Sequence, residues 1–189
     1  MQDCVRSYPQ FSLCGLNCGL CPRYHTEGDS RCPGCGGPGF RLKHPACAVI
    51  SCNKKHDDVE FCFQCSAYPC GKYAKPEAAD SFISYRNIAR DFQDAQKDLD
   101  SYKKNLERKT VILRYLLDTH DNGRRKNYYC QAVNLLDLEF LEDLVGIIQK
   151  DIEPLRIDVN AKSSLIVQLI ESQAKKTGLE LGLRKKNTP

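Results

Sequence analysis

The sequence has 189 residues, which is enough for one compact domain or two small ones. Hydrophobic residues make up 41% and charged residues 28%, a balance that excludes a disordered chain and a membrane-type composition. The 28 Lys and Arg residues against 24 Asp and Glu residues give a net charge of +4, which is too small to indicate nucleic-acid binding.

Cysteine dominates the first third of the sequence. Ten of the 12 cysteines lie within the 57 residues from Cys14 to Cys70, a stretch rich in Gly and Pro but poor in Ile, Leu and Val. A segment this short buries too little apolar surface to fold around an ordinary hydrophobic core, so it needs covalent or metal cross-links. We therefore expect residues 1–75 to form a small, irregular, metal-stabilised module of knuckle turns with little regular structure.

The cross-links are expected to be metal ions. The N-terminus carries no apolar run of the signal-peptide type and no stretch is as long and apolar as a membrane span, so we expect a cytoplasmic protein without a membrane partner. Disulfides do not persist in the reducing cytoplasm, whereas clustered cysteines there commonly bind metal.

Cysteine pairs separated by two residues strengthen this interpretation, because a tight turn lets both thiolates reach one ion. In the sharpest example, Pro33 and Gly34 set the turn between Cys32 and Cys35, and Gly36 tolerates the left-handed conformation. The other two pairs are Cys18 with Cys21 and Cys62 with Cys65. The expected metal ligands are Cys14, Cys18, Cys21, Cys32, Cys35, Cys47, Cys52, Cys62, Cys65 and Cys70.

Three histidines lie among these cysteines, and each could replace a thiolate. Of His25, His44 and His56, the best placed is His44, three residues before Cys47. A solvated loop histidine is the simpler interpretation of each one singly. Cys4, near the N-terminus, has no partner at ligand spacing and looks incidental.

Helical periodicity begins after residue 75. Pro76 and Glu77 suit the first turn of a helix, and an apolar stripe follows at Phe82, Tyr85, Ile88, Ala89 and Phe92. The strongly charged residues 93–109 are expected to continue as an exposed helix or a helical hairpin. A renewed apolar face at Val111, Ile112, Tyr115 and Leu116 is predicted to end at Asp121–Asn122–Gly123.

Two further helices are predicted in the last third of the chain. Asp137 is expected to cap a helix that ends before Pro154, and Asn160 to cap another that Gly178 ends. Residues 155–159 alternate in polarity like a short strand, with 179–183 as a candidate partner, and Arg184–Lys186 reads as a solvated tail. The predicted fold is therefore α+β: the cysteine-rich module (1–75), then a helical domain (76–189) of about four helices with a short two-stranded ribbon.

Several motifs resemble one known family. They are Leu13-Cys14-Gly15-Leu16-Asn17-Cys18-Gly19-Leu20-Cys21-Pro22, then Cys32-Pro33-Gly34-Cys35, then Glu60–Cys65 through Tyr68–Cys70, and finally Asp121–Lys126 before Tyr128–Cys130. On these motifs residues 12–136 resemble the family known as domain of unknown function 3795. The resemblance implies a bacterial or archaeal protein that binds metal, zinc in particular, and has no assigned reaction.

Zinc is the leading hypothesis for the metal. Ten thiolates suffice for two closed four-cysteine sites with two cysteines left over, so we expect two zinc ions. Cysteine pairs often combine across a distance, and one such combination is Cys32 and Cys35 with Cys62 and Cys65.

An iron–sulfur cluster is the alternative cofactor. Cys14, Cys18 and Cys21 have the spacing that radical S-adenosylmethionine enzymes use to hold a four-iron four-sulfur cluster, and a distant fourth thiolate would complete an ordinary cluster. The rest of the sequence lacks the alternating strands and helices of that enzyme fold.

Cys130 stands apart from the other cysteines. The neighbouring Arg124, Arg125 and Lys126 would lower its pKa if they approached it, and the same three residues could bind a phosphate or carboxylate. A small buried apolar residue is the simpler interpretation of Cys130, and a solvated loop that of the basic residues.

These observations favour a zinc-stabilised binding module that contacts a protein or a small anionic ligand, rather than an enzyme. The alternative is an iron–sulfur or zinc-dependent redox protein or enzyme that uses a spare thiolate or Cys130. Nucleic-acid binding is disfavoured because residues 1–75 carry 9 Lys and Arg against 6 Asp and Glu, and two four-thiolate zinc sites would turn this +3 into −1.

Overall fold

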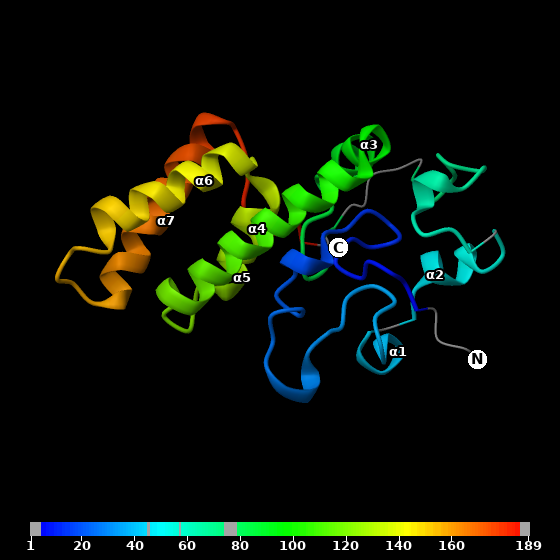
Figure 1. Ribbon diagram of the computed structural model, residues 1–189, viewed down its shortest axis with the longest axis horizontal. Coiled ribbons are helices and arrows are strands. Elements are labelled where there is room, and N and C mark those ends of the chain that lie inside the picture. The colour runs from blue at the N-terminus through cyan, green and yellow to red at the C-terminus, as the bar shows by residue number, and fades with distance from the viewer. Residues whose placement is uncertain (1–4, 45, 57, 74–78, 186–189) are drawn as a thin grey trace.

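Helix α4 (Leu99–His120) is the centre of the fold. In the computed structural model, which describes residues 5–44, 46–56, 58–73 and 79–185, this helix contacts α3, α5, α6 and α7, as well as the turn at Cys18–Leu20. Figure 1 shows helices α4 to α7 on one side of the molecule and the loops of the cysteine-rich module on the other. The helices are α1 (Phe40–Lys43), α2 (Ala48–Asn53), α3 (Ile88–Lys97), α4, α5 (Lys126–Leu135), α6 (Leu138–Ile147) and α7 (Val159–Lys176).

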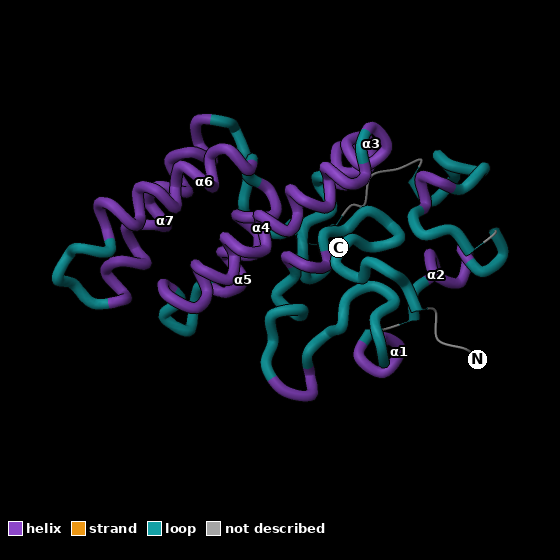
Figure 2. The backbone as a smooth tube through the Cα atoms, viewed as in Figure 1, coloured by secondary structure: helices purple, strands orange, loops and turns teal. Residues whose placement is uncertain are grey.

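The described part of the chain contains helices, turns and loops but no strand, as Figure 2 shows, so the predicted α+β class is wrong. The alternating residues 155–159 connect the π-turn after α6 (Ile148–Ile152) to α7, and Leu155 and Ile157 remain 42% and 41% exposed. Their expected partner, residues 179–183, instead runs toward the segment before α3. Without a neighbouring chain to pair with, an alternating pattern does not make a ribbon.

The start of α3 also differs from the prediction. Residues 74–78, which include the expected start at Pro76 and Glu77 and the domain boundary, lie outside the described residues. Residues 79–87 form turns, and Asp80 organises them because its carboxylate accepts hydrogen bonds from the Tyr85 amide (2.9 Å) and the Ser84 hydroxyl (3.3 Å). The helix begins only at Ile88, and Phe82 is left 47% exposed.

The charged segment 93–109 follows the hairpin alternative. Helix α3 ends at Lys97, and Asp98 starts α4 by accepting a hydrogen bond from the Ser101 amide at 3.0 Å. The predicted end at Asp121–Gly123 is confirmed: α4 stops at His120, and Gly123 has a positive φ of 81°.

The last two helices begin and end close to the predicted positions. Asp137 occupies the first cap position of α6, although its carboxylate pairs with Arg90 (3.2 Å). Helix α7 is capped by Asp158, not Asn160, through a 2.8 Å hydrogen bond from the Ala161 amide.

Gly178 ends α7 as predicted. Its φ is 65°, its amide donates to the Lys175 carbonyl (3.3 Å), and the Leu179 amide donates to the Ala174 carbonyl (2.8 Å). These two bonds form a Schellman motif, which satisfies carbonyls that the helix end leaves open.

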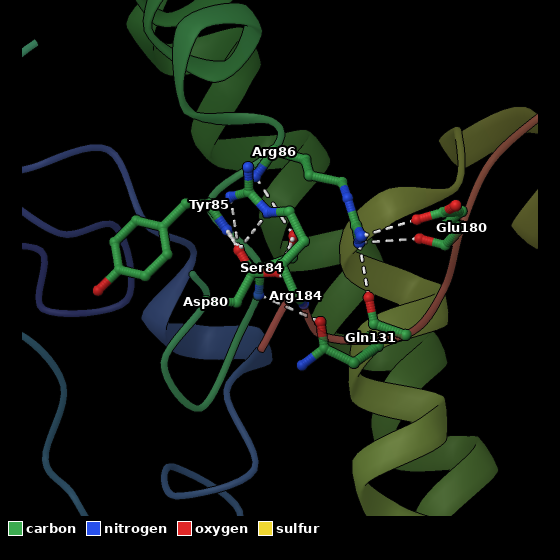
Figure 3. Close-up of polar contacts among 8 residues, drawn as sticks. Asp80, Ser84, Tyr85, Arg86, Gln131, Glu180 and Arg184 are labelled. Carbon is green, nitrogen blue, oxygen red and sulfur yellow. Dashed lines mark hydrogen bonds and ion pairs between the residues drawn. The ribbon is translucent and has the colours of Figure 1, made fainter. Parts of the chain in front are cut away.

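The segment after α7 is held to the rest of the protein up to Arg184, which is therefore not part of a solvated tail, whereas Lys185 is exposed. Arg184 donates from its backbone amide (2.8 Å) and its guanidinium (2.7 Å) to the carboxylate of Asp80, and Arg86 donates to the carbonyls of Glu180 (2.9 Å) and Gly182 (2.7 Å) (Figure 3). Lys186 lies outside the described residues. These contacts fasten the end of the chain to the segment that precedes α3.

The cysteine-rich module shares its hydrophobic core with the helices, which the sequence analysis did not expect. Phe11, Leu20 and Phe61 are fully buried in the same core as Phe92 of α3 and Leu113 of α4. The Phe11 ring lies 5.1 Å from that of Phe61 and 6.0 Å from that of Phe92. A second, smaller core lies within the module and consists of Leu13, Cys32, Cys35, Phe40 and Ile50.

Candidate metal centre and an adjoining polar cavity

Two of the three cysteine pairs form the tight turns that their spacing predicts. The amide of Cys21 donates to the carbonyl of Cys18 at 3.1 Å, and the amide of Cys65 donates to that of Cys62 at 3.1 Å, each closing a turn of 3-10 helix. The two cysteines of each pair therefore lie at opposite ends of one turn.

The third pair is held differently. The amide of Cys35 donates to the carbonyl of Pro9 at 2.9 Å instead of to Cys32, and the loop passes through positive φ at Gly34 (84°) and Gly36 (71°). Both values lie in the region that favours glycine. Gly34 also lets the loop press against the backbone of Pro9.

Backbone amides point at several of the sulfur atoms. Hydrogen bonds from the amides of Arg23 and Tyr24 lower the pKa of Cys21, although burial, the larger effect, raises it to about 11. The Leu13 amide acts on Cys35 in the same way. Amides aimed at sulfur stabilise a thiolate, which is the form that binds metal.

Six cysteines are called here the inner cysteine group: Cys14, Cys18, Cys21, Cys32, Cys35 and Cys47. Four of them lie near Cys18, and Cys47 lies near Cys14 and Cys35. Burial raises the pKa of Cys18 well above its usual value, and the nearby thiols of Cys35, Cys14, Cys21 and Cys32 raise it further. Burial also raises the pKa of Cys14 to about 12, with contributions from Cys35 and Cys47. Mutual repulsion of this kind requires that the sulfur atoms lie near one another.

The other four form the outer cysteine group: Cys52, Cys62, Cys65 and Cys70. Burial raises the pKa of Cys62 to about 11, and Cys70, Cys52 and Cys65 add to the shift. Cys32 and Cys35 thus lie near Cys18, together with Cys14 and Cys21, and Cys62 packs against the small core that contains Cys32 and Cys35. The predicted combination of Cys32 and Cys35 with Cys62 and Cys65 therefore stays a prediction.

The described cysteines are all free thiols, so no disulfide links them. Within the described ranges, no three Cys, His, Asp or Glu side chains converge closely enough to hold a metal ion. Cys4 falls outside those ranges. The donor set suits zinc or an iron–sulfur cluster in its chemistry, since it offers soft thiolates on short turns with amides aimed at sulfur. A bound ion would need the sulfur atoms of a group to draw together.

The three histidines that the sequence offers as alternative ligands lie in three different environments. His25 hydrogen-bonds the Gly19 carbonyl through Nε2 at 2.7 Å, and burial lowers its pKa. The ring of His44 stacks on that of Phe40 at 4.5 Å, and His56 is exposed.

Cys130 is completely buried in α5. Burial raises its pKa to about 12; Cys21 raises it further, and Lys126 lowers it by less than burial raises it. Arg124 is exposed on the loop before α5, and Arg125 is half-buried with its Nε atom lacking a hydrogen-bond partner. A thiol in this environment is protonated at neutral pH and is not an activated nucleophile.

A polar cavity that sequence reasoning missed adjoins the inner cysteine group. It has a volume of about 430 Å³ and lies between α3, α4 and the start of α6, with Asn17 in its wall. The Asn17 amide donates to the carboxylate of Asp91 (3.0 Å) and to the side-chain oxygen of Asn134 (3.3 Å), and the hydroxyl of Tyr102 donates to Asn17 (2.8 Å).

A buried acidic side chain, Asp91, and a half-buried basic one, Lys109, line this cavity. Burial raises the pKa of Asp91 to about 7, against the effects of Lys109 and Arg90. Burial also lowers the pKa of Lys109 to about 8, and its ammonium donates to the carbonyl of Leu136 at 2.6 Å. The sequence held one signal for this site: Asp91 lies three residues after Ile88 and four before Ala95, on the inward face of α3.

Residues 10–75 match the family described as "Protein of unknown function (DUF3795)", and the match spans both cysteine groups and Asn17. Residues 10–75, the part of the chain that matches this family, are called here the DUF3795 domain. The predicted resemblance is thus shown for this stretch, whereas Asp121–Lys126 and Cys130 lie outside the matched residues. No curated protein and no solved structure matches the chain.

None of the helices in the described part of the chain is both long and apolar enough to span a bilayer.

Proposed function

We propose that the DUF3795 domain of this chain is a zinc-stabilised binding module in which each cysteine group holds one zinc ion. The observation that carries the proposal is the division of ten free thiols into two groups, six inner and four outer. Four thiolates around one zinc ion make a closed structural site, so the outer group is complete and the inner group has two cysteines to spare.

Electrostatics supports a cation at both groups. Burial and neighbouring thiols raise the pKa of Cys14 to about 12 and of Cys62 to about 11, so crowded thiolates are unfavourable there without a positive ion. A divalent ion reverses this cost and deprotonates its thiol ligands. A structural zinc site contributes on the order of 10 kcal/mol to folding, which suits a domain built largely of loops.

In this proposal the module binds a protein or a small anionic ligand. The protein is proposed to be cytoplasmic, because thiols stay reduced in the cytoplasm and remain able to bind zinc. In this proposal the ions fix loops that pack on α3 and α4, and they take no part in a reaction.

An iron–sulfur cluster in the inner group is the second candidate. Cys14, Cys18 and Cys21 lie in one group together with Cys32 and Cys35, so a fourth thiolate is within the same cluster of side chains. Three cysteines at this spacing plus one from elsewhere can hold four iron atoms.

Metal analysis of anaerobically purified protein, together with its visible spectrum, tests the proposal. We expect a colourless protein with two zinc ions per chain. Cys65→Ser should lose the outer ion, and changing Cys14, Cys18 and Cys21 together to Ser should lose the inner one, because only three thiols of the inner group then remain. Cys130→Ala, which alters a cysteine in neither group, should keep both ions.

Two results would contradict the proposal. Brown protein that contains iron and acid-labile sulfide would favour the second candidate. Protein that contains no metal after purification and takes up none on titration with zinc would exclude both.

A further inference from the structure

We propose that the polar cavity between α3 and α4 binds a free α-amino acid, whose ammonium group faces Asp91 and whose carboxylate faces Lys109. This site lies in the helices and is lined by one DUF3795 residue, Asn17, so it does not depend on the metal proposal. Its volume of about 430 Å³ is in the range of small-molecule sites.

Asn17 and Asp91, which line the cavity, belong to a buried polar network that also includes Asn134. Asn17, Asp91 and Asn134 are 4%, 7% and 2% exposed, and Asn17 hydrogen-bonds both of the others. The hydroxyl of Tyr102 holds the Asn17 side chain from the other side at 2.8 Å. Buried polar groups carry a desolvation cost unless they are hydrogen-bonded. A network whose side chains are fixed by several hydrogen bonds keeps its remaining acceptor oxygens in a fixed orientation.

The charged side chains around the opening largely engage one another. Arg90 pairs with Asp137 at 3.2 Å, and Lys97 pairs with Asp94 at 3.5 Å. The carboxylate of Asp98 accepts the Ser101 amide at the start of α4. Among the described residues, the lining charges without an ion-pair partner are Asp91, Lys109 and Asp98, and the carboxylate of Asp98 is engaged by the start of α4.

Asp91 and Lys109 do not pair with each other within 4 Å, although they are close enough to influence each other's ionisation. Burial disfavours the charged form of both groups. A compact molecule that carries one ammonium and one carboxylate would satisfy both charges at once, which neither a simple amine nor a simple acid does. A free α-amino acid is the smallest common molecule with that pair of charges.

Leu106 and Leu138 add apolar surface to the cavity, and Ser101 and Asn105 add polar groups. The side chain of the bound amino acid can therefore contact apolar or polar groups, so the probes include amino acids with apolar and with polar side chains.

Isothermal titration calorimetry at pH 7 with glycine, L-leucine, L-serine and L-glutamine as separate probes tests the proposal. For the probe that binds best, the matching amine without the carboxylate and the matching acid without the amine are titrated as well. We expect each half-molecule to bind at least tenfold more weakly than the amino acid, since each lacks one charged contact.

The variants separate the two contacts. Asp91→Asn and Lys109→Met should each weaken amino-acid binding about tenfold to a hundredfold. Lys109→Met should leave the weak binding of the amine unchanged, and Asp91→Asn that of the acid. The matched controls Asp118→Asn and Lys104→Met, exposed positions on α4, should bind the amino acid like the unaltered protein.

Equal binding of the amino acid and its two half-molecules to the unaltered protein would overturn the proposal, as would no heat of binding for any probe at 10-millimolar concentration. These comparisons need no variant, so they remain decisive if Asp91→Asn or Lys109→Met fails to fold. Loss of binding by the two exposed control variants would also contradict the assignment. Metal content is measured on the same samples, so failure of the amino-acid site and failure of the zinc proposal give different results.

Discussion

Gly34 shows how closely one residue of the DUF3795 domain is fitted to its surroundings. A Cβ atom added there would lie 2.5 Å from the carbonyl oxygen of Pro9, on a backbone with a φ of +84°. Gly28 has a similar φ of +69°, but a Cβ atom there would have nothing within 4 Å. Both glycines therefore have a left-handed backbone, but only Gly34 also lies too close to Pro9 for a side chain.

We predict that Gly34→Ala destabilises the protein more than Gly28→Ala does. Both variants carry about 1–2 kcal/mol for the left-handed conformation, and Gly34→Ala adds about 1–3 kcal/mol for the forced contact with Pro9. Urea denaturation of the metal-loaded protein measures the difference. Equal losses of stability in the two variants would show that the loop does not press against Pro9.

Asp80 is the second residue with a defined role, since its fully buried side chain joins two segments far apart in the sequence. Burial alone would raise its pKa, but hydrogen bonds from Arg184 and Tyr85 outweigh burial and hold the pKa at about 2. A carboxyl whose pKa is lower in the folded state adds stability above its unfolded value, and this stability is lost as the pH falls through the folded value.

Asp80→Asn should therefore lower the free energy of unfolding by about 2–3 kcal/mol at pH 7, because it removes the buried carboxylate that pairs with Arg184. The difference from the unaltered protein should shrink between about pH 4 and pH 2, where Asp80 itself becomes protonated. Chemical denaturation across this pH range measures it, with the exposed Asp118→Asn as a control. A difference that stays constant with pH would disprove the ionic role of Asp80.

At the scale of elements, helix ends that depend on residues next to them in the sequence were predicted well. The end of α4 at Asp121–Gly123 and the end of α7 at Gly178 depend on neighbouring residues, and both are confirmed. The predictions of where α3 begins and of a two-stranded ribbon were wrong, because both features depend on contacts between distant segments. Arg184 lies 104 residues from Asp80, and no periodicity within residues 155–159 or 179–183 carries that information.

Helix α7 offers a test of its starting residue. Asp158→Ala should cost about 1 kcal/mol because the Ala161 amide loses its acceptor. Asn160→Ala should cost less, since the Asn160 side chain makes only an exposed contact with Asn122. Thermal denaturation of both variants compares them, and a larger loss for Asn160→Ala would restore the cap predicted from sequence.

For the whole molecule, the sequence identified the cysteine-rich domain and its turn-forming pairs but not the way in which the domain packs. Counting Ile, Leu and Val overlooked aromatic residues such as Phe11 and Phe61, which join it to α3 and α4. The grouping of cysteines could not be predicted because it depends on how separate loops approach one another. The same holds for the polar cavity, where Asn17 meets Asp91 from 74 residues away.

This shared core sets the expected effect of metal removal. A chelator should make residues 12–73 sensitive to protease while α4 to α7 keep most of their helical circular dichroism, since α1 and α2 are short and the rest of the domain is loops. Limited proteolysis with fragment mass analysis, before and after addition of zinc, measures this. Chelated protein that is free of metal yet retains full protease resistance would show that the metal has no structural role.

The central claim is that ten thiols in two groups hold two zinc ions, and native mass spectrometry of the intact chain tests it most directly. We predict one dominant species that carries two zinc ions, with eight of the ten cysteines of the two groups protected from alkylation until a chelator is added. A metal-free chain whose thiols all react at once, or a chain that carries iron and sulfide, would contradict it.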